Sequence, residues 1–127
     1  MNKSWLTLII ILVFGVTSCS KNEDYYRKHP KELQQAVNAC PEKKSQGLTC
    51  QQLKVLANRM NTLAYQLQMN PQGFGKKILA LQETIGKSQE QLKNGSTNTN
   101  LQTSLTQNNR DLADYLAVVR WLESPTS

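Results

Sequence analysis

The chain has 127 residues, with 15 Lys and Arg, 9 Asp and Glu and one His, and its formal net charge is +6. This length allows one or at most two small domains and excludes a large multidomain architecture. The sequence holds only one long apolar run, which excludes a bundle of transmembrane helices, and one His with three Cys leaves little material for a metal site.

The first residues have the three-part layout of a secretory signal. Lys3 gives a positive start, residues 5–14 are apolar except for Thr7, and small or polar residues follow. This apolar run is too short to span a hydrocarbon core of ~30 Å, which needs about 20 residues. We therefore expect residues 1–18 to be a signal peptide that is removed.

The end of this signal resembles a bacterial lipobox, because residues 16–18 (Val-Thr-Ser) lead directly into Cys19. Proteins with that motif carry lipid on the Cys and are cleaved just before it. The resemblance implies a lipid on Cys19, a lipidated tether over residues 19–29, and an anchored protein in the bacterial envelope that faces the periplasm. Two or more acyl chains give stable anchoring. Ser20 favours the outer membrane and leaves the inner membrane open.

Cys40 and Cys50 remain once Cys19 carries lipid. Export into an oxidising compartment favours a disulfide between them. Closing so short a loop would stabilise the fold by about 2–3 kcal/mol. The alternative is two free or metal-binding thiols, although no second pair of Cys or His exists to complete a zinc site.

A first helix is predicted from about Pro30 to Cys40. Pro30 suits the first turn of a helix, His29 then lies near the N-cap, and Pro41 ends the helix. The apolar face of this helix consists of Leu33, Val37 and Cys40.

Two longer helices follow, within a disulfide-stapled helical region expected to cover residues 30–93. Thr49 and Gln52 have the spacing of a capping box at the start of the first, and residues 70–73 (Asn-Pro-Gln-Gly) separate the two. Apolar residues then recur at alternating spacings of three and four, which predicts one apolar face on each helix. The faces are Leu53, Leu56, Met60, Leu63 and Leu67, then Phe74, Ile78, Leu81, Ile85, Ser88 and Leu92.

Residues 94–100 are polar and without periodicity, so we expect a flexible linker there. A C-terminal amphipathic helix is predicted over residues 101–123, with Asn108 as the only polar residue of its face and Val118 and Trp121 forming a second apolar contact. The main face is Leu101, Leu105, Asn108, Leu112, Tyr115, Val119 and Leu122.

Together these patterns predict an all-α fold, a small helical bundle or helical hairpins with one disulfide. An elongated rod that resembles a coiled coil is the alternative, and the helix faces also permit self-association.

The residues for a catalytic centre are sparse. The lone His29 is expected to be a cap or surface residue, and residues 86–88 (Gly-Lys-Ser) lack the upstream Gly of a phosphate-binding loop. The basic residues form no dense stripe interleaved with aromatics, so no nucleic acid is expected as a partner. We therefore expect no enzyme activity, no cofactor and no metal site. Four acidic residues have the spacing of solvated helix faces: Glu83, Glu90, Asp111 and Asp114.

The segment from Tyr25 to Glu32 resembles the EexN-like entry-exclusion lipoproteins, which place an aromatic-x-x-His-Pro-x-Glu segment and two Cys behind a lipobox. The resemblance covers about residues 19–50, and familiar members end soon after the second Cys. The matched residues are Cys19, Tyr26, His29, Pro30, Glu32, Cys40 and Cys50.

This resemblance implies a non-enzymatic lipoprotein that binds a component of a conjugative type IV secretion channel and blocks redundant transfer into the cell. The alternative is a structural or assembly lipoprotein of a secretion or cell-wall complex, which the helical extension after Cys50 indicates.

Overall fold

A computed structural model describes residues 21–40 and 47–123 of the chain, and in these ranges the protein folds into five helices and no strand. The prediction of an all-α fold is confirmed. Cys19 and the expected signal peptide lie outside the described residues. The helices are α1 (Glu23–Lys28), α2 (Pro30–Asn38), α3 (Cys50–Met69), α4 (Pro71–Lys93) and α5 (Thr99–Glu123).

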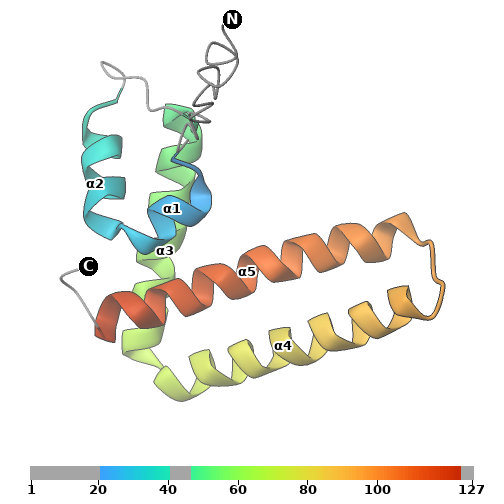
Figure 1. The fold of residues 1–127 in the computed structure, drawn as a ribbon. Coiled ribbons are helices and arrows are strands. Elements are labelled where there is room, and N and C mark those ends of the chain that lie inside the picture. The colour runs from blue at the N-terminus through green and yellow to red at the C-terminus, as the bar shows by residue number, and fades with distance from the viewer. Residues whose placement is uncertain (1–20, 41–46, 124–127) are drawn as a thin grey trace, which may run out of the picture.

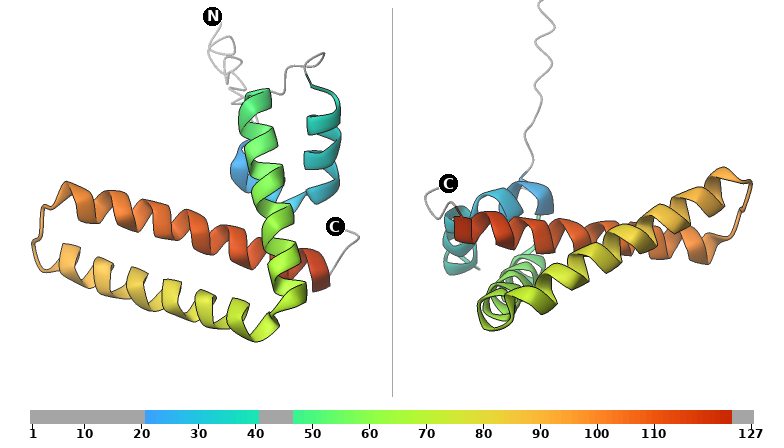
Figure 2. Two further views of the ribbon diagram at one scale, coloured as in Figure 1. Left: turned by 180° about the vertical axis from the view of Figure 1, so that it is seen from behind. Right: turned by 90° about the horizontal axis from the view of Figure 1, so that it is seen from below.

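The helices are arranged as a small head and a long arm (Figure 1). The head consists of α1, α2 and the first part of α3, and the arm is the antiparallel hairpin of α4 and α5. Helix α3 runs across the arm, and α5 returns along α4 to reach α1 in the head (Figure 2). The protein is therefore built from helical hairpins, as one of the predictions had it.

The hydrophobic core lies where α3 meets the arm and the two short helices. The predicted apolar faces of α2, α3 and α4 supply most of it, which confirms the periodicity of three and four. Leu33, Leu53, Met60 and Val118 are almost fully buried. The buried members of this cluster are Tyr26, Leu33, Leu53, Leu56, Ala57, Met60, Leu63, Phe74, Ala117 and Val118.

Helix α5 uses two different faces along its length. The predicted face follows α4 down the arm, whereas Ala117 and Val118 turn toward the head, where Trp121 also packs against the core. The predicted second contact is thus confirmed. Leu122, which was expected on the main face, is 43% exposed. The reason is that the head covers a new side of α5 once the helix has passed α3.

The structure differs from the expected tether over residues 19–29, because Glu23–Lys28 form α1. Asn22 caps this helix by accepting a hydrogen bond from the backbone N–H of Tyr25 at 3.0 Å. Tyr26 is 2% exposed and belongs to the core. A helix of six residues is too short to show a periodic pattern and depends on tertiary packing, so sequence patterning did not reveal it.

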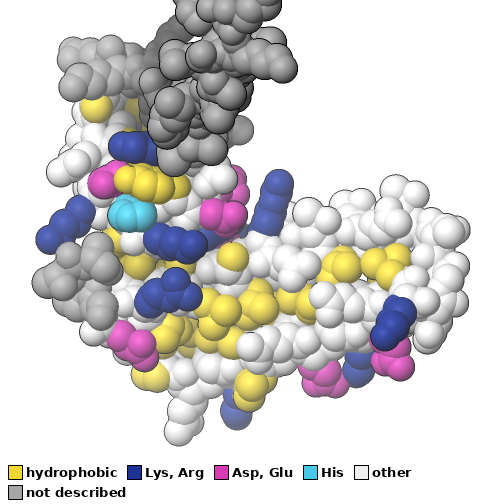
Figure 3. Space-filling model, viewed as in Figure 1, with side chains coloured by type: hydrophobic (Ala, Val, Ile, Leu, Met, Phe, Trp, Pro, Cys, Tyr) yellow, Lys and Arg dark blue, Asp and Glu magenta, His cyan; other side chains and the backbone are white. Residues whose placement is uncertain are grey.

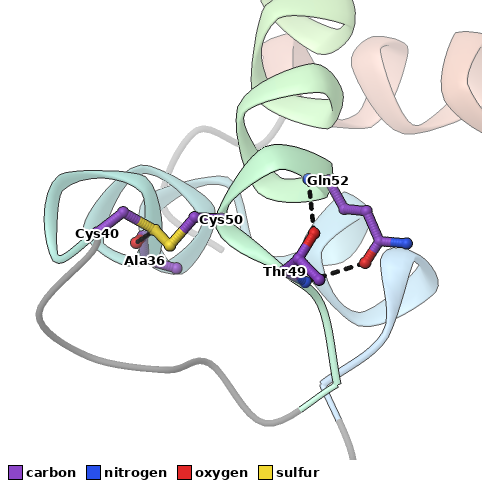
Figure 4. The surroundings of a disulfide bond; sticks show 5 residues. All are labelled: Ala36, Cys40, Thr49, Cys50 and Gln52. Atoms are coloured by element: carbon purple, nitrogen blue, oxygen red, sulfur yellow. Dashed lines mark hydrogen bonds between the residues drawn. A yellow bond between two sulfur atoms is a disulfide. The ribbon is translucent and has the colours of Figure 1, made fainter.

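A disulfide joins the end of α2 to the start of α3 (Figure 4). The Cα atoms of Cys40 and Cys50 are 5.9 Å apart, and the predicted disulfide is confirmed. The capping box is also present. The backbone N–H of Gln52 donates to Thr49 Oγ1 at 3.1 Å, and the backbone N–H of Thr49 donates to Gln52 Oε1 at 2.9 Å.

The arm reverses direction at Gly95, just after α4 ends. Gly95 has a φ of +94°, and the N–H groups of Gly95 and Ser96 donate to the carbonyls of Leu92 and Gln91 at 3.2 and 3.3 Å. This pair of bonds is a Schellman motif, which needs a left-handed residue at this position. The connection is shorter than the linker expected over residues 94–100, because α5 begins at Thr99.

No helix in the described part of the chain combines the length and apolar character that crossing a membrane requires.

Replacing Gly95 with Ala should lower the free energy of unfolding by about 1 kcal/mol, because an L side chain is strained at positive φ. The matched control is Gly86→Ala in the middle of α4, where an added Cβ meets open space. That change should raise the free energy of unfolding by up to about 1 kcal/mol. Urea unfolding followed by circular dichroism measures both, and equal effects of the two variants would contradict the assignment of the turn.

Candidate functional site around the His-Pro motif

The His-Pro motif is divided between the core and the surface. Tyr26 is buried in the core, and Pro30 occupies the first turn of α2. Tyr25, His29 and Glu32 gather instead on the outer side of α1 and α2, together with Lys21. We refer to Lys21, Tyr25, His29 and Glu32 as the motif cluster.

Tyr25 fixes the position of the His29 ring. The two rings are stacked with centroids 4.2 Å apart and an interplanar angle of 18°, and His29 Nδ1 lies 2.8 Å from the carbonyl oxygen of Tyr25. A carbonyl oxygen only accepts, so the Nδ1–H donates this bond. His29 occupies the N-cap of α2 as predicted, but its side chain makes no capping hydrogen bond.

Glu32 is held from two sides. The phenolic O–H of Tyr25 donates to its carboxylate, and Lys21 Nζ lies 3.3 Å from Glu32 Oε2. The Tyr25 hydrogen bond is the main reason that the pKa of Glu32 is lowered, and Lys21 adds to the effect. The same hydrogen bond raises the pKa of Tyr25. The cluster therefore presents an ionised carboxylate and an aromatic pair in fixed positions.

Space-filling views place the histidine on the surface, with hydrophobic and Lys or Arg side chains around it (Figure 3). Such a mixture of ring faces, a carboxylate and cations can bind a protein surface through stacking and hydrogen bonds. Within residues 21–40 and 47–123, no group of three or more His, Cys, Asp or Glu side chains could hold a metal ion.

Behind this cluster, Asp114 is buried between two arginines. Arg27 Nε donates to Asp114 Oδ1 at 2.6 Å, and Arg59 Nε donates to Asp114 Oδ2. Asp114 is 2% exposed. A solvated Asp114 was predicted, and that prediction is wrong. Spacing along α5 could not show that α1 and α3 each bring an arginine to the same turn.

The neighbouring acids complete this ion cluster. Asp111, which was also expected to be solvated, is partly buried and bonds Arg59 Nη2 at 2.5 Å. Arg27 Nη1 is 2.6 Å from Asp24, and its Nη2 is 3.2 Å from Glu23. Burial is the largest single influence on the pKa of Arg27 and lowers it. The acidic partners, Asp114 foremost, together raise the pKa of Arg27 above its ordinary value. The predicted exposure of Glu83 and Glu90 agrees with the structure.

Trp121 adds a second connection between α1 and α5. Its indole N–H donates to the carbonyl oxygen of Arg27 at 2.6 Å. Arg27 is therefore held by its side chain and by its backbone, and this fixes the helix that carries the motif. Sequence reasoning found Trp121 as an apolar contact but gave no signal of this hydrogen bond.

The described cysteines lie at the junction of α2 and α3, and Cys19 is outside the described residues. A comparison with protein-family models, with curated proteins and with solved structures gives no match to this chain.

Replacing Asp114 with Asn should lower the free energy of unfolding by about 3 kcal/mol, because two arginines then lose a buried anionic partner. The matched control is Asp111→Asn, which removes a more exposed carboxylate from the same network and should cost at most about 1 kcal/mol. Urea unfolding measures both variants. Equal losses would show that burial of Asp114 does not matter for stability.

Replacing Tyr25 with Phe should raise the pKa of Glu32 toward its ordinary value, because the donor to the carboxylate is removed. Since folding lowers this pKa, the interaction adds stability at neutral pH and loses it as the pH falls through the folded-state pKa. Carboxyl NMR titration measures the shift. Glu83 is an internal control in the same spectrum, because its pKa is lowered by Lys87 and should not move. An unchanged pKa of Glu32 would contradict the proposed hydrogen bond.

Proposed function

We propose that this chain is a non-enzymatic lipoprotein of the entry-exclusion type, which binds a component of a conjugative type IV secretion channel. The observation that carries the proposal is the motif of Tyr26, His29, Pro30 and Glu32 behind the lipobox Cys19. In this proposal the protein faces the periplasm from a bacterial envelope membrane, with Ser20 favouring the outer one.

The arrangement of the motif cluster supports this function on physical grounds. Tyr25 and Glu32 hold their positions through one hydrogen bond, and the stacked His29 ring leaves little rotamer freedom to lose when a partner binds. Lys21 follows Cys19 by two residues, so a lipid on Cys19 would keep the cluster close to the bilayer.

A second candidate is a structural or assembly lipoprotein, and the arm favours it. Beyond the head, α4 and α5 have only each other to pack against, so Leu92, Leu101 and Leu105 are only partly buried. A line of hydrophobic side chains follows the seam between the two helices (Figure 3). Such a face suits a further helix of an assembly or of a second copy.

A mating assay tests the first candidate. Recipient cells that make the protein should receive the conjugative element that encodes it less often than cells that lack the protein. An unrelated element should enter both equally. Equal transfer of the cognate element would contradict entry exclusion. Cys19→Ser should release the protein from membranes and abolish exclusion, and a variant that stays bound and active would contradict lipidation.

Two matched charge reversals locate the functional surface. Glu32→Lys and Glu83→Lys each replace a glutamate that pairs with a lysine, one in the motif cluster and one on the arm. Under the entry-exclusion proposal only Glu32→Lys should reduce exclusion. Loss of exclusion with Glu83→Lys alone would place the functional surface on the arm and contradict a role of the motif cluster. The assembly function predicts instead that removal of the protein weakens a complex without altering exclusion.

A further inference from the structure

The middle of the chain contains no acidic residue. No Asp or Glu occurs between Glu42 and Glu83, whereas six basic residues do. Helix α3 and the first half of α4 lie entirely within this stretch. Two of these basic residues, Lys76 and Lys77, lie at the start of α4, just after the elbow at which α3 turns into α4. The six basic residues are Lys43, Lys44, Lys54, Arg59, Lys76 and Lys77.

A groove lies at this elbow, on a different surface from the motif cluster. Two adjoining hollows of about 520 and 370 Å³ share Gln66, Lys77 and Tyr115 in their linings. Because they share these residues, we treat them as one feature, the elbow groove. Most of its lining residues belong to α3, α4 and α5. Figure 2 shows how these three helices are arranged.

One end of the elbow groove is polar. Asn58, Thr62 and Asn108 line it with amide and hydroxyl groups, which suit the backbone of a bound peptide. The only acidic group in the lining is Asp111, and it is already bonded to Arg59 at 2.5 Å. Lys77 has no ion-pair partner among the described residues, so its charge is available to a ligand.

The other end of the elbow groove is apolar. Tyr65 and Met69 line it and are 63% and 67% exposed. Phe74 is buried there, and its ring lies 4.5 Å from that of Tyr115. An exposed Tyr and Met beside an aromatic pair, in which Phe74 is buried and Tyr115 partly buried, form a surface that can accept a bulky apolar side chain.

We propose that the elbow groove binds a segment of a partner protein that carries an acidic side chain beside a bulky apolar one. The acidic group pairs with Lys77, the apolar group packs against Met69 and Tyr65, and the backbone bonds the amides at the polar end. Charge complementarity is the main argument, since no acidic residue of α3 or of early α4 competes for Lys77. This inference goes beyond the proposed function, because it needs no conjugative channel.

Selection from a phage-displayed library of random peptides tests the proposal on the full chain, purified in detergent and immobilised. We expect the recovered peptides to be enriched in Asp or Glu next to Leu, Phe or Trp. Their affinity should fall as salt rises, because exposed charges are screened. Peptides without acidic residues, or recovery of no peptide, would overturn the proposal.

Two pairs of matched variants locate the binding. Lys76→Glu/Lys77→Glu should weaken binding of a selected peptide by at least about tenfold, since like charges then face each other. Lys31→Glu/Lys93→Glu makes the same change in net charge at exposed residues outside the groove and should have little effect. Likewise Met69→Ser should weaken binding, whereas Leu79→Ser should not, although Leu79 is 66% exposed. Equal effects within either pair would overturn the proposal.

Two other occupants are separate outcomes of the same test. Binding of phosphatidylglycerol vesicles that is lost with Lys76→Glu/Lys77→Glu, in the absence of peptide binding, would assign the groove to lipid and overturn the proposal. Concentration-dependent association of the full chain that Met69→Ser abolishes would assign the groove to a second copy of the chain. That outcome would also overturn the proposal.

Discussion

The buried contact of Asp114 with Arg27 and Arg59 is the constraint on which the arrangement of the helices depends. A carboxylate without water is costly unless charged donors replace the water. Here each oxygen of Asp114 accepts from a different arginine, and these arginines come from α1 and α3. Apolar contacts alone would tolerate several crossing angles, whereas hydrogen bonds between charged groups have defined directions. The ion cluster therefore fixes how α5 crosses the head.

The position of the two candidate surfaces follows from this constraint. Arg27 belongs to α1, which also carries Tyr25 of the motif cluster, and Arg59 lies in the lining of the elbow groove. Asp114 therefore contacts the helix that carries the motif cluster through Arg27, and it contacts the lining of the elbow groove through Arg59. The motif cluster on the head and the elbow groove beside the arm are thus both connected to this ion cluster, while the far end of the arm depends only on the pairing of α4 with α5.

A disulfide and helix caps stabilise a fold whose hydrophobic core is small for the length of the chain. The Cys40–Cys50 disulfide joins the two helices at the end of the head, and the capping box of Thr49 starts α3 directly beside it. At the far end of the arm, the Schellman motif at Gly95 closes α4 without any core around it. Small folds commonly need such covalent and capping contributions, because they bury little apolar surface.

The sequence by itself determined the helical class, the four longer helices, the disulfide and the capping box of Thr49 and Gln52. Spacing of apolar residues reveals which side of a helix is buried, and Thr49 and the prolines act on their immediate neighbours. Only the tertiary structure decided that α1 exists, that Asp114 is buried and that α3 crosses the arm to form the elbow groove. The periodicity of apolar residues predicts that one face of α5 is buried, but it does not show which helix covers that face. Arg27, Arg59 and Asp114 are far apart in the chain, and their pairing is visible only once the helices are packed.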